Sequence, residues 1–121
     1  MKLSSMSSDH QDSVAAILSK FGKPEVCNYG DHIEWTVPLD TQASTTLIIR
    51  YVGPRYGAGW ICLLDRWGRC FAQSSGDDES PARLTPQAAY DNLLVRYQES
   101  ICKDQALLDS LRNPHLGLNV P

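Results

Sequence analysis

The sequence predicts an α+β fold with an N-terminal helix, a five-stranded antiparallel meander sheet, and one or two C-terminal helices packed on one face of the sheet. Two observations carry this prediction. β-Branched and aromatic residues dominate residues 45–52 and 60–64, on either side of a Gly-rich segment. Apolar residues with helical spacing precede and follow this region. The 121 residues are expected to form a single domain, 1–121, with flexible ends at 1–7 and 115–121.

The first helix is predicted to start at Ser8, which lies three residues before Gln11 in the spacing of a capping box. Gly22 and then Pro24 are expected to end it. The apolar stripe of this helix consists of Val14, Ile17, Leu18 and Phe21.

A hairpin follows, with strands at 25–29 and 32–37 around Gly30 and Asp31, a pair suited to a type II′ turn. This register places Val26 opposite Trp35. The core face is then predicted to hold Val26, Ile33, Trp35 and Val37, and the other face Cys27, Tyr29, His32 and Glu34. Residues 38–44 are expected to be a polar connection.

The remaining strands are predicted at 45–52, 60–64 and 69–73. The segment 53–59 is interpreted as a wide hairpin loop, because a phosphate-binding loop would lead into a helix rather than a strand. Residues 65–68 fit a four-residue loop with a left-handed Gly68, which pairs Leu64 with Arg69. Cys62 and Cys70 then point to opposite faces.

Residues 74–81 are acidic and turn-rich, and are expected to form an exposed loop. Thr85 then caps a helix that has Pro86 at its first position. A further short helix or a continuation from Lys103 should end before Asn113 and Pro114. The apolar stripe expected to face the core is Ala89, Tyr90, Leu93, Leu94, Tyr97 and Ile101.

Composition narrows the function classes. The net charge is −3, but residues 49–72 carry four Lys/Arg against one Asp/Glu, so the sheet centre is basic. No apolar run reaches the ~18 residues of a membrane span, and the first residues lack a secretory core, so we expect a cytoplasmic protein without membrane contact. Four dispersed cysteines are expected to be reduced thiols. The three histidines are scattered and the sequence contains no cofactor motif, so we expect neither a metal nor a cofactor.

The candidate contact surface combines the basic and aromatic residues of the meander loops with an acidic loop. Its predicted members are Arg55, Tyr56, Arg66, Trp67 and Arg69, with Asp77, Asp78 and Glu79 as an oppositely charged second contact. Trp67 either anchors a partner or folds back onto the sheet edge of its own domain.

The leading hypothesis is a nonenzymatic protein-binding module, an inhibitor that blocks a macromolecular surface. Base rates for small acidic proteins suggest anti-CRISPR or toxin-immunity proteins as examples. The alternative is binding of RNA or single-stranded nucleic acid, with Tyr56, Trp60 and Trp67 stacking on bases. A third possibility is a small enzyme that uses Cys27, His32 and Glu34.

Overall fold

The computed structural model of the protein describes residues 6–40, 44–52, 59–74 and 83–112. Most of the Gly-rich segment, most of the acidic loop and most of the two ends that we expected to be flexible lie outside the described residues. Ser74, the described residue of the loop predicted at 74–81, is buried and not exposed as expected, because its hydroxyl accepts a hydrogen bond from the Cys62 N–H at 2.9 Å.

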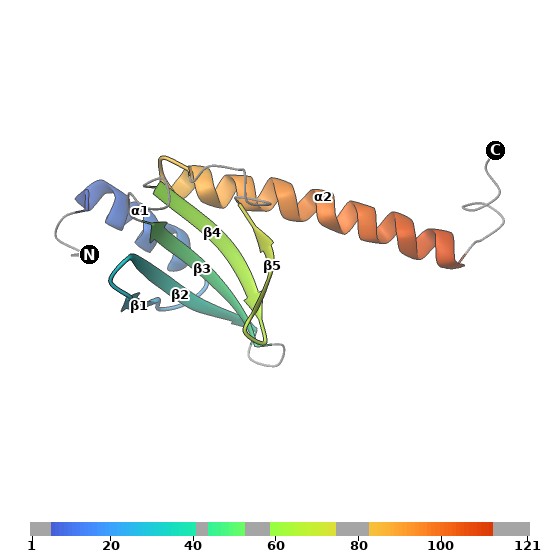
Figure 1. Cartoon of the computed structure of the whole chain (residues 1–121), viewed down its shortest axis with the longest axis horizontal. Coiled ribbons are helices and arrows are strands. Elements are labelled where there is room, and N and C mark those ends of the chain that lie inside the picture. Colours follow the sequence, from blue (N-terminus) through green and yellow to red (C-terminus); the bar gives the residue numbers. More distant parts are fainter. Residues whose placement is uncertain (1–5, 41–43, 53–58, 75–82, 113–121) are drawn as a thin grey trace.

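The described elements confirm the predicted α+β class. In the sequence, one helix precedes and one follows a five-stranded antiparallel sheet, whose strands are adjacent in sequence order (Figure 1). In chain order the elements are α1 (Ser8–Leu18), β1 (Glu25–Asn28), β2 (His32–Asp40), β3 (Thr45–Val52), β4 (Gly59–Arg66), β5 (Arg69–Gln73) and α2 (Pro86–Arg112).

Both helices lie on one face of the sheet and enclose the core with it (Figure 1). The helices contribute the buried residues Val14, Ile17, Leu18, Ala89 and Leu93. The sheet contributes Ile33, Trp35, Val37, Leu47, Ile49, Trp60, Cys62 and Leu64. Alternate residues of β2, β3 and β4 therefore supply the core, as the period of a strand requires.

Helix α1 begins as predicted, but its cap differs. Ser8 is the first helical residue and Ser7 occupies the cap position without a side-chain hydrogen bond, so the expected capping box is not formed. Phe21 is 41% exposed, because the helix ends at Leu18 and the stripe stops there. Gly22 follows with a φ of 149°, a conformation that glycine tolerates.

The first hairpin has the predicted register, with Val26 opposite Trp35 and Gly30 in the left-handed region. Val26 was nevertheless wrongly assigned to the core: it is 46% exposed, because it lies on the edge strand β1, all of which is exposed. Strand β2 also continues beyond its expected end to Asp40. The β1 pairing stops at Thr36, so Pro38 lies where β2 is an edge strand, a position that proline accepts.

The turn between β4 and β5 is tighter than predicted. Arg66 pairs with Arg69, so the loop contains two residues rather than four. The expected pairing of Leu64 with Arg69 is wrong, because the shorter loop pairs Arg69 with Arg66. A shift between Leu64 and Asp65 then places Leu64 opposite Ala72. Cys62 and Cys70 still point to opposite faces, and all four cysteines are free.

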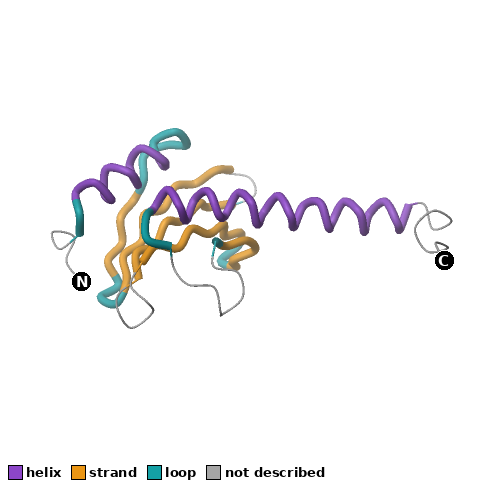
Figure 2. The backbone as a smooth tube through the Cα atoms, turned by 90° about the horizontal axis from the view of Figure 1, so that it is seen from above, coloured by secondary structure: helices purple, strands orange, loops and turns teal. Residues whose placement is uncertain are grey.

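Helix α2 is one continuous helix and not two. The Ala88 N–H donates to the Thr85 hydroxyl at 3.1 Å, which confirms the predicted cap. Leu94 and Ile101 do not face the core as expected; they are 49% and 44% exposed. Ile101 lies in the second half of the helix, which runs past the end of the sheet in Figure 2 and has no sheet to cover. Leu94 lies beside the buried Leu93 but on a different side of the helix.

Candidate functional site

The tip of the β4–β5 hairpin presents an exposed tryptophan. Trp67 has a φ of 58° and Gly68 a φ of 77°, the pair of positive values that a type I′ turn requires. Asparagine and glycine normally fill such turns, because a side chain in the left-handed region costs about 1–2 kcal/mol. Trp67 is 71% exposed, so the expectation that it folds back onto its own sheet edge is wrong.

Arg66 is held in place beside this tryptophan. Its Nε donates to the Thr45 hydroxyl at 3.2 Å, and its guanidinium lies 4.5 Å from the centroid of the Phe71 ring. The Phe71 ring in turn meets Tyr97 of α2 edge to face, at 5.9 Å between centroids. The hairpin tip is therefore braced against β3 and α2, and Arg66 has a preferred orientation before any partner binds.

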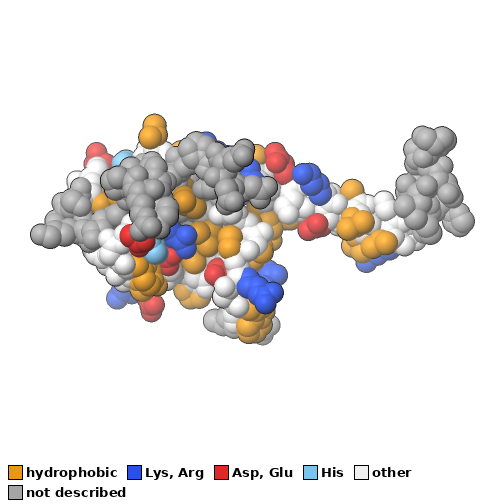
Figure 3. Space-filling view, in the orientation of Figure 1, with side chains coloured by type: hydrophobic (Ala, Val, Ile, Leu, Met, Phe, Trp, Pro, Cys, Tyr) orange, Lys and Arg blue, Asp and Glu red, His pale blue; other side chains and the backbone are white. Residues whose placement is uncertain are grey.

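The charge at the tip is uncompensated within the part of the chain that the structure describes. Arg66 and Arg69 are paired directly across the two strands, an arrangement of like charges that disfavours the hairpin. Ion pairs among the described residues are formed by His32 and Arg50, and neither hairpin arginine has a carboxylate partner there. Figure 3 shows basic and hydrophobic side chains gathered at the lower end of the molecule, where β4 turns into β5. We call Arg66, Trp67 and Arg69 the hairpin tip.

The structure thus brings together three of the eight predicted site residues. Arg55 and Tyr56, like the acidic residues Asp77, Asp78 and Glu79, lie outside the described residues. Sequence reasoning missed Phe71 and Tyr97, which support the tip. The sequence predicted that Tyr97 faces the core, but it gave no signal for the contact with Phe71, because the shift of pairing between β4 and β5 decides where Phe71 lies.

Trp60, one of the three aromatic residues expected to stack on bases in the nucleic-acid alternative, is buried in the core. Trp60 is 1% exposed and its indole N–H donates to His10 at 3.4 Å, so its ring is not available to a base. Trp35 and Tyr51 pack against the same ring, at 5.5 and 5.0 Å between centroids. Trp60 is therefore a core residue.

The cluster proposed for an enzyme forms a charge network instead. Arg50 contacts the Oε1 of Glu34 through Nε at 2.7 Å and Nη2 at 2.6 Å. The two ring nitrogens of His32 face carboxylates, Asp31 at 2.7 Å and Glu34 at 3.5 Å. Cys27 interacts with Tyr29, whose pKa it raises through a side-chain hydrogen bond. A nucleophile needs a base within hydrogen-bond reach, and no histidine or carboxylate among the described residues forms a hydrogen bond with the Cys27 thiol.

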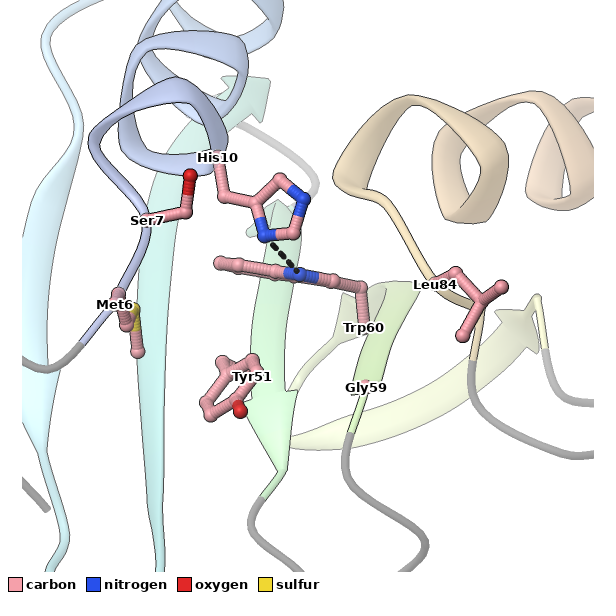
Figure 4. A pocket seen from close by; sticks show the side chains of 7 residues that line it. All are labelled: Met6, Ser7, His10, Tyr51, Gly59, Trp60 and Leu84. Atoms are coloured by element: carbon pink, nitrogen blue, oxygen red, sulfur yellow. Dashed lines mark hydrogen bonds between the residues drawn. The ribbon is translucent and has the colours of Figure 1, made fainter.

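A pocket of about 270 Å³ lies between the start of α1 and the adjoining ends of β3 and β4 (Figure 4). Its walls are Met6, Ser7, His10, Tyr51, Gly59, Trp60 and Leu84. The volume is just below the usual range for small-molecule sites, and its most polar contact, between His10 and Trp60, is already satisfied within the protein. The other polar side chains of the lining are Ser7, which makes no side-chain cap hydrogen bond, and Tyr51.

Other kinds of site find no support in the described ranges. Residues 6–40, 44–52, 59–74 and 83–112 contain no group of three His, Cys, Asp or Glu side chains placed to hold a metal ion. Neither described helix has an apolar stretch of the length needed to cross a bilayer. Comparison with protein-family models, with curated proteins and with solved structures gives no match.

Proposed function

We propose that the protein is a nonenzymatic binding module that docks a protein partner through the hairpin tip. The observation that carries this proposal is Trp67, which is 71% exposed and occupies a left-handed turn position. Exposing an indole forgoes burial worth about 1.5–3 kcal/mol, and the left-handed backbone adds a further cost. Folding does not require either cost, since Asn-Gly would make the same turn more favourably.

The tip defines the chemistry of its partner. An indole between two guanidinium groups matches an apolar socket rimmed by carboxylates, and tryptophan and arginine are the residues that most often anchor interfaces. Because the tip is already braced by Thr45 and Phe71, little side-chain entropy is lost on docking. Such a module acts by occupying its partner's surface, so inhibition by steric blocking is the mode of action that we propose.

We place this function in the cytoplasm. Cys27, Cys70 and Cys102 are free and exposed, which suits a reducing compartment, where thiols persist.

The test separates binding from folding by exchanging Trp67 for the residue that the turn prefers. Trp67→Asn creates the favoured Asn-Gly turn, so the free energy of unfolding should rise by about 1 kcal/mol. Affinity for a partner captured from the source organism should fall by about 2 kcal/mol or more, the scale of an interface anchor. Calorimetric titration with that partner and denaturant unfolding measure the two quantities.

Leu84→Asn is the matched control, because Leu84 is 83% exposed and lies away from the hairpin. This variant should bind like the wild type. Unchanged affinity in Trp67→Asn would exclude the hairpin tip as the site. A steep linear fall of log affinity with log salt, about one unit of slope per phosphate contact, would instead identify a nucleic-acid partner.

A further inference from the structure

The pocket beside α1 lies at the opposite end of β4 from the hairpin tip. Trp60 is near the start of β4, whereas the tip begins at Arg66, where this strand ends. Figure 4 shows Trp60 between His10 and Tyr51 in the lining. The Trp60 N–H donates to the Arg83 carbonyl at 2.7 Å, and the Arg83 N–H donates to the Trp60 carbonyl at 2.8 Å. The wall at Trp60 is therefore fixed before any ligand binds.

The contact between Trp60 and His10 determines where the His10 ring carries its proton. An indole nitrogen can only donate, and that of Trp60 donates to Nδ1 of His10 at 3.4 Å. Nδ1 is therefore unprotonated, and the proton of the neutral ring lies on Nε2. Figure 4 shows this second nitrogen on the side of the ring turned away from Trp60. Within the described part of the chain the His10 ring forms no second hydrogen bond, so its Nε2–H is a free donor.

Two hydroxyl groups complete the polar part of the lining. Ser7 is exposed and makes no side-chain cap hydrogen bond, and Tyr51 is half-buried. Hydroxyls can donate as well as accept, so Ser7, Tyr51 and the His10 ring are all able to donate a hydrogen bond. A carbonyl oxygen has two lone pairs and no proton, and it is the ligand group that matches a lining of donors.

The charge and the size of the pocket restrict the ligand further. Its described lining contains no Asp, Glu, Lys or Arg, so a charged group that entered it would lose water without gaining an ionic partner. A neutral ligand does not have this cost. The volume of about 270 Å³ is just below the usual range for drug-sized molecules, which indicates a compound with one ring.

We propose that this pocket binds a neutral aromatic compound of one ring that carries a carbonyl oxygen. The oxygen accepts a hydrogen bond from the Nε2–H of His10. The ring of the ligand lies against Met6 and Tyr51, which are both half-buried, because thioether and aromatic groups make favourable contacts with an aromatic ring. The hairpin tip takes no part in this site, so the proposal does not depend on the proposed function.

Probes of one shape and different charge test the ligand class. Benzamide is neutral, benzoate is an anion and benzamidine is a cation. The full isotope-labelled chain is titrated with each probe and followed by NMR at about pH 8, where histidine is neutral. Benzamide should shift the Trp60 indole N–H and the His10 and Tyr51 amide signals saturably, with a dissociation constant of about 1 mM or lower. Benzoate and benzamidine should bind at least ~tenfold more weakly, because neither finds an ionic partner. The absence of a saturable shift with benzamide, or equally tight binding of either ion, would overturn the proposal.

The variant His10→Asn separates the contact with the ligand from the contact with Trp60. The asparagine oxygen can still accept from the Trp60 indole, but the Nε2–H donor is lost. Affinity for benzamide should fall at least ~fivefold, whereas toluene, a ring without an acceptor, should bind the variant and the wild type alike.

Ser8→Asn is the matched control, because Ser8 is an exposed residue of α1 outside the described lining. This variant should bind benzamide like the wild type. Unchanged affinity of His10→Asn for benzamide would overturn the assigned hydrogen bond. Equal losses of benzamide and toluene would do the same, since they would show a change in the shape of the pocket and not the loss of a donor.

Discussion

The three tryptophans of this chain have separate roles because of where the pleat and the turn place them. Trp35 and Trp60 are 6% and 1% exposed, on the face of the sheet that the helices cover, and their rings pack against each other. Trp67 is not part of a strand. It lies in the two-residue turn between β4 and β5, so strand alternation does not place it on the core face. The residue type alone therefore says little about role, while its phase in the strand pattern decides it.

Cys62 gives a prediction at the level of one residue. Burial raises the pKa of its thiol to about 12, from an ordinary value of 9.0. Between these two values the unfolded chain ionises at this position and the folded chain does not. The Cys62 contribution to stability is therefore present below pH 9 and is lost as the pH rises through this interval, with a slope of at most about 1.4 kcal/mol per pH unit.

Chemical unfolding at several alkaline pH values measures this slope. Cys62→Ala should be less stable below pH 9, because it leaves a cavity, but its stability should fall less between pH 9 and pH 12. Identical slopes in the variant and the wild type would show that Cys62 is not the group responsible.

At the level of secondary-structure elements, local chemistry predicted most boundaries. Strand β3 and the ends of β5 were predicted from composition and turn residues, as was the start of α2 at Pro86. The errors concern side-chain exposure, which depends on elements that are distant in the sequence. Val26 has the alternation of a core residue, but its strand lies at the uncovered edge. Ile101 has the spacing of a core residue, but the sheet ends before the helix does.

The candidate site was predicted in part for the same reason. The turn between two apolar runs indicated that Trp67 is exposed. The position of the Phe71 ring beside Arg66 depends on a shift in strand pairing, and no pattern in the sequence predicts that shift.

The ion pair between Glu34 and Arg50 ties β2 to β3 and supports a prediction at this scale. Glu34 is 8% exposed, and Arg50 lies directly opposite it in the register. Arg50→Met would leave a buried carboxylate with His32 as its remaining ion-pair partner among the described residues, and should cost about 2–4 kcal/mol in unfolding free energy. Glu34→Leu combined with Arg50→Met should cost less than Arg50→Met alone, because no charge is left uncompensated.

Denaturant unfolding of the two variants and the wild type gives the comparison. A double variant that is less stable than Arg50→Met would contradict the prediction. It would show that the attraction between Glu34 and Arg50 is larger than the free-energy cost of desolvating the two charges.

At the level of the whole molecule, two surfaces lie on different parts of the fold. The hairpin tip ends the β4–β5 hairpin, and the exposed apolar residues Ile101, Leu108 and Leu111 lie along the second half of α2. The hairpin tip and α2 are joined through Phe71, which touches Arg66 on one side and Tyr97 on the other.

Removal of the second half of α2 tests whether partner binding needs more than the hairpin tip. A chain that stops after Gln98 keeps the buried residues of α2, namely Pro86, Ala89 and Leu93, together with Tyr97. Its unfolding midpoint should therefore stay within about 4 °C of that of the full chain. It should bind the partner of the hairpin tip as tightly as the full chain does. Trp67→Asn should show the opposite behaviour, with an intact α2 and weak partner binding. A truncated chain that keeps its unfolding midpoint but loses the partner would mean that the partner also needs α2.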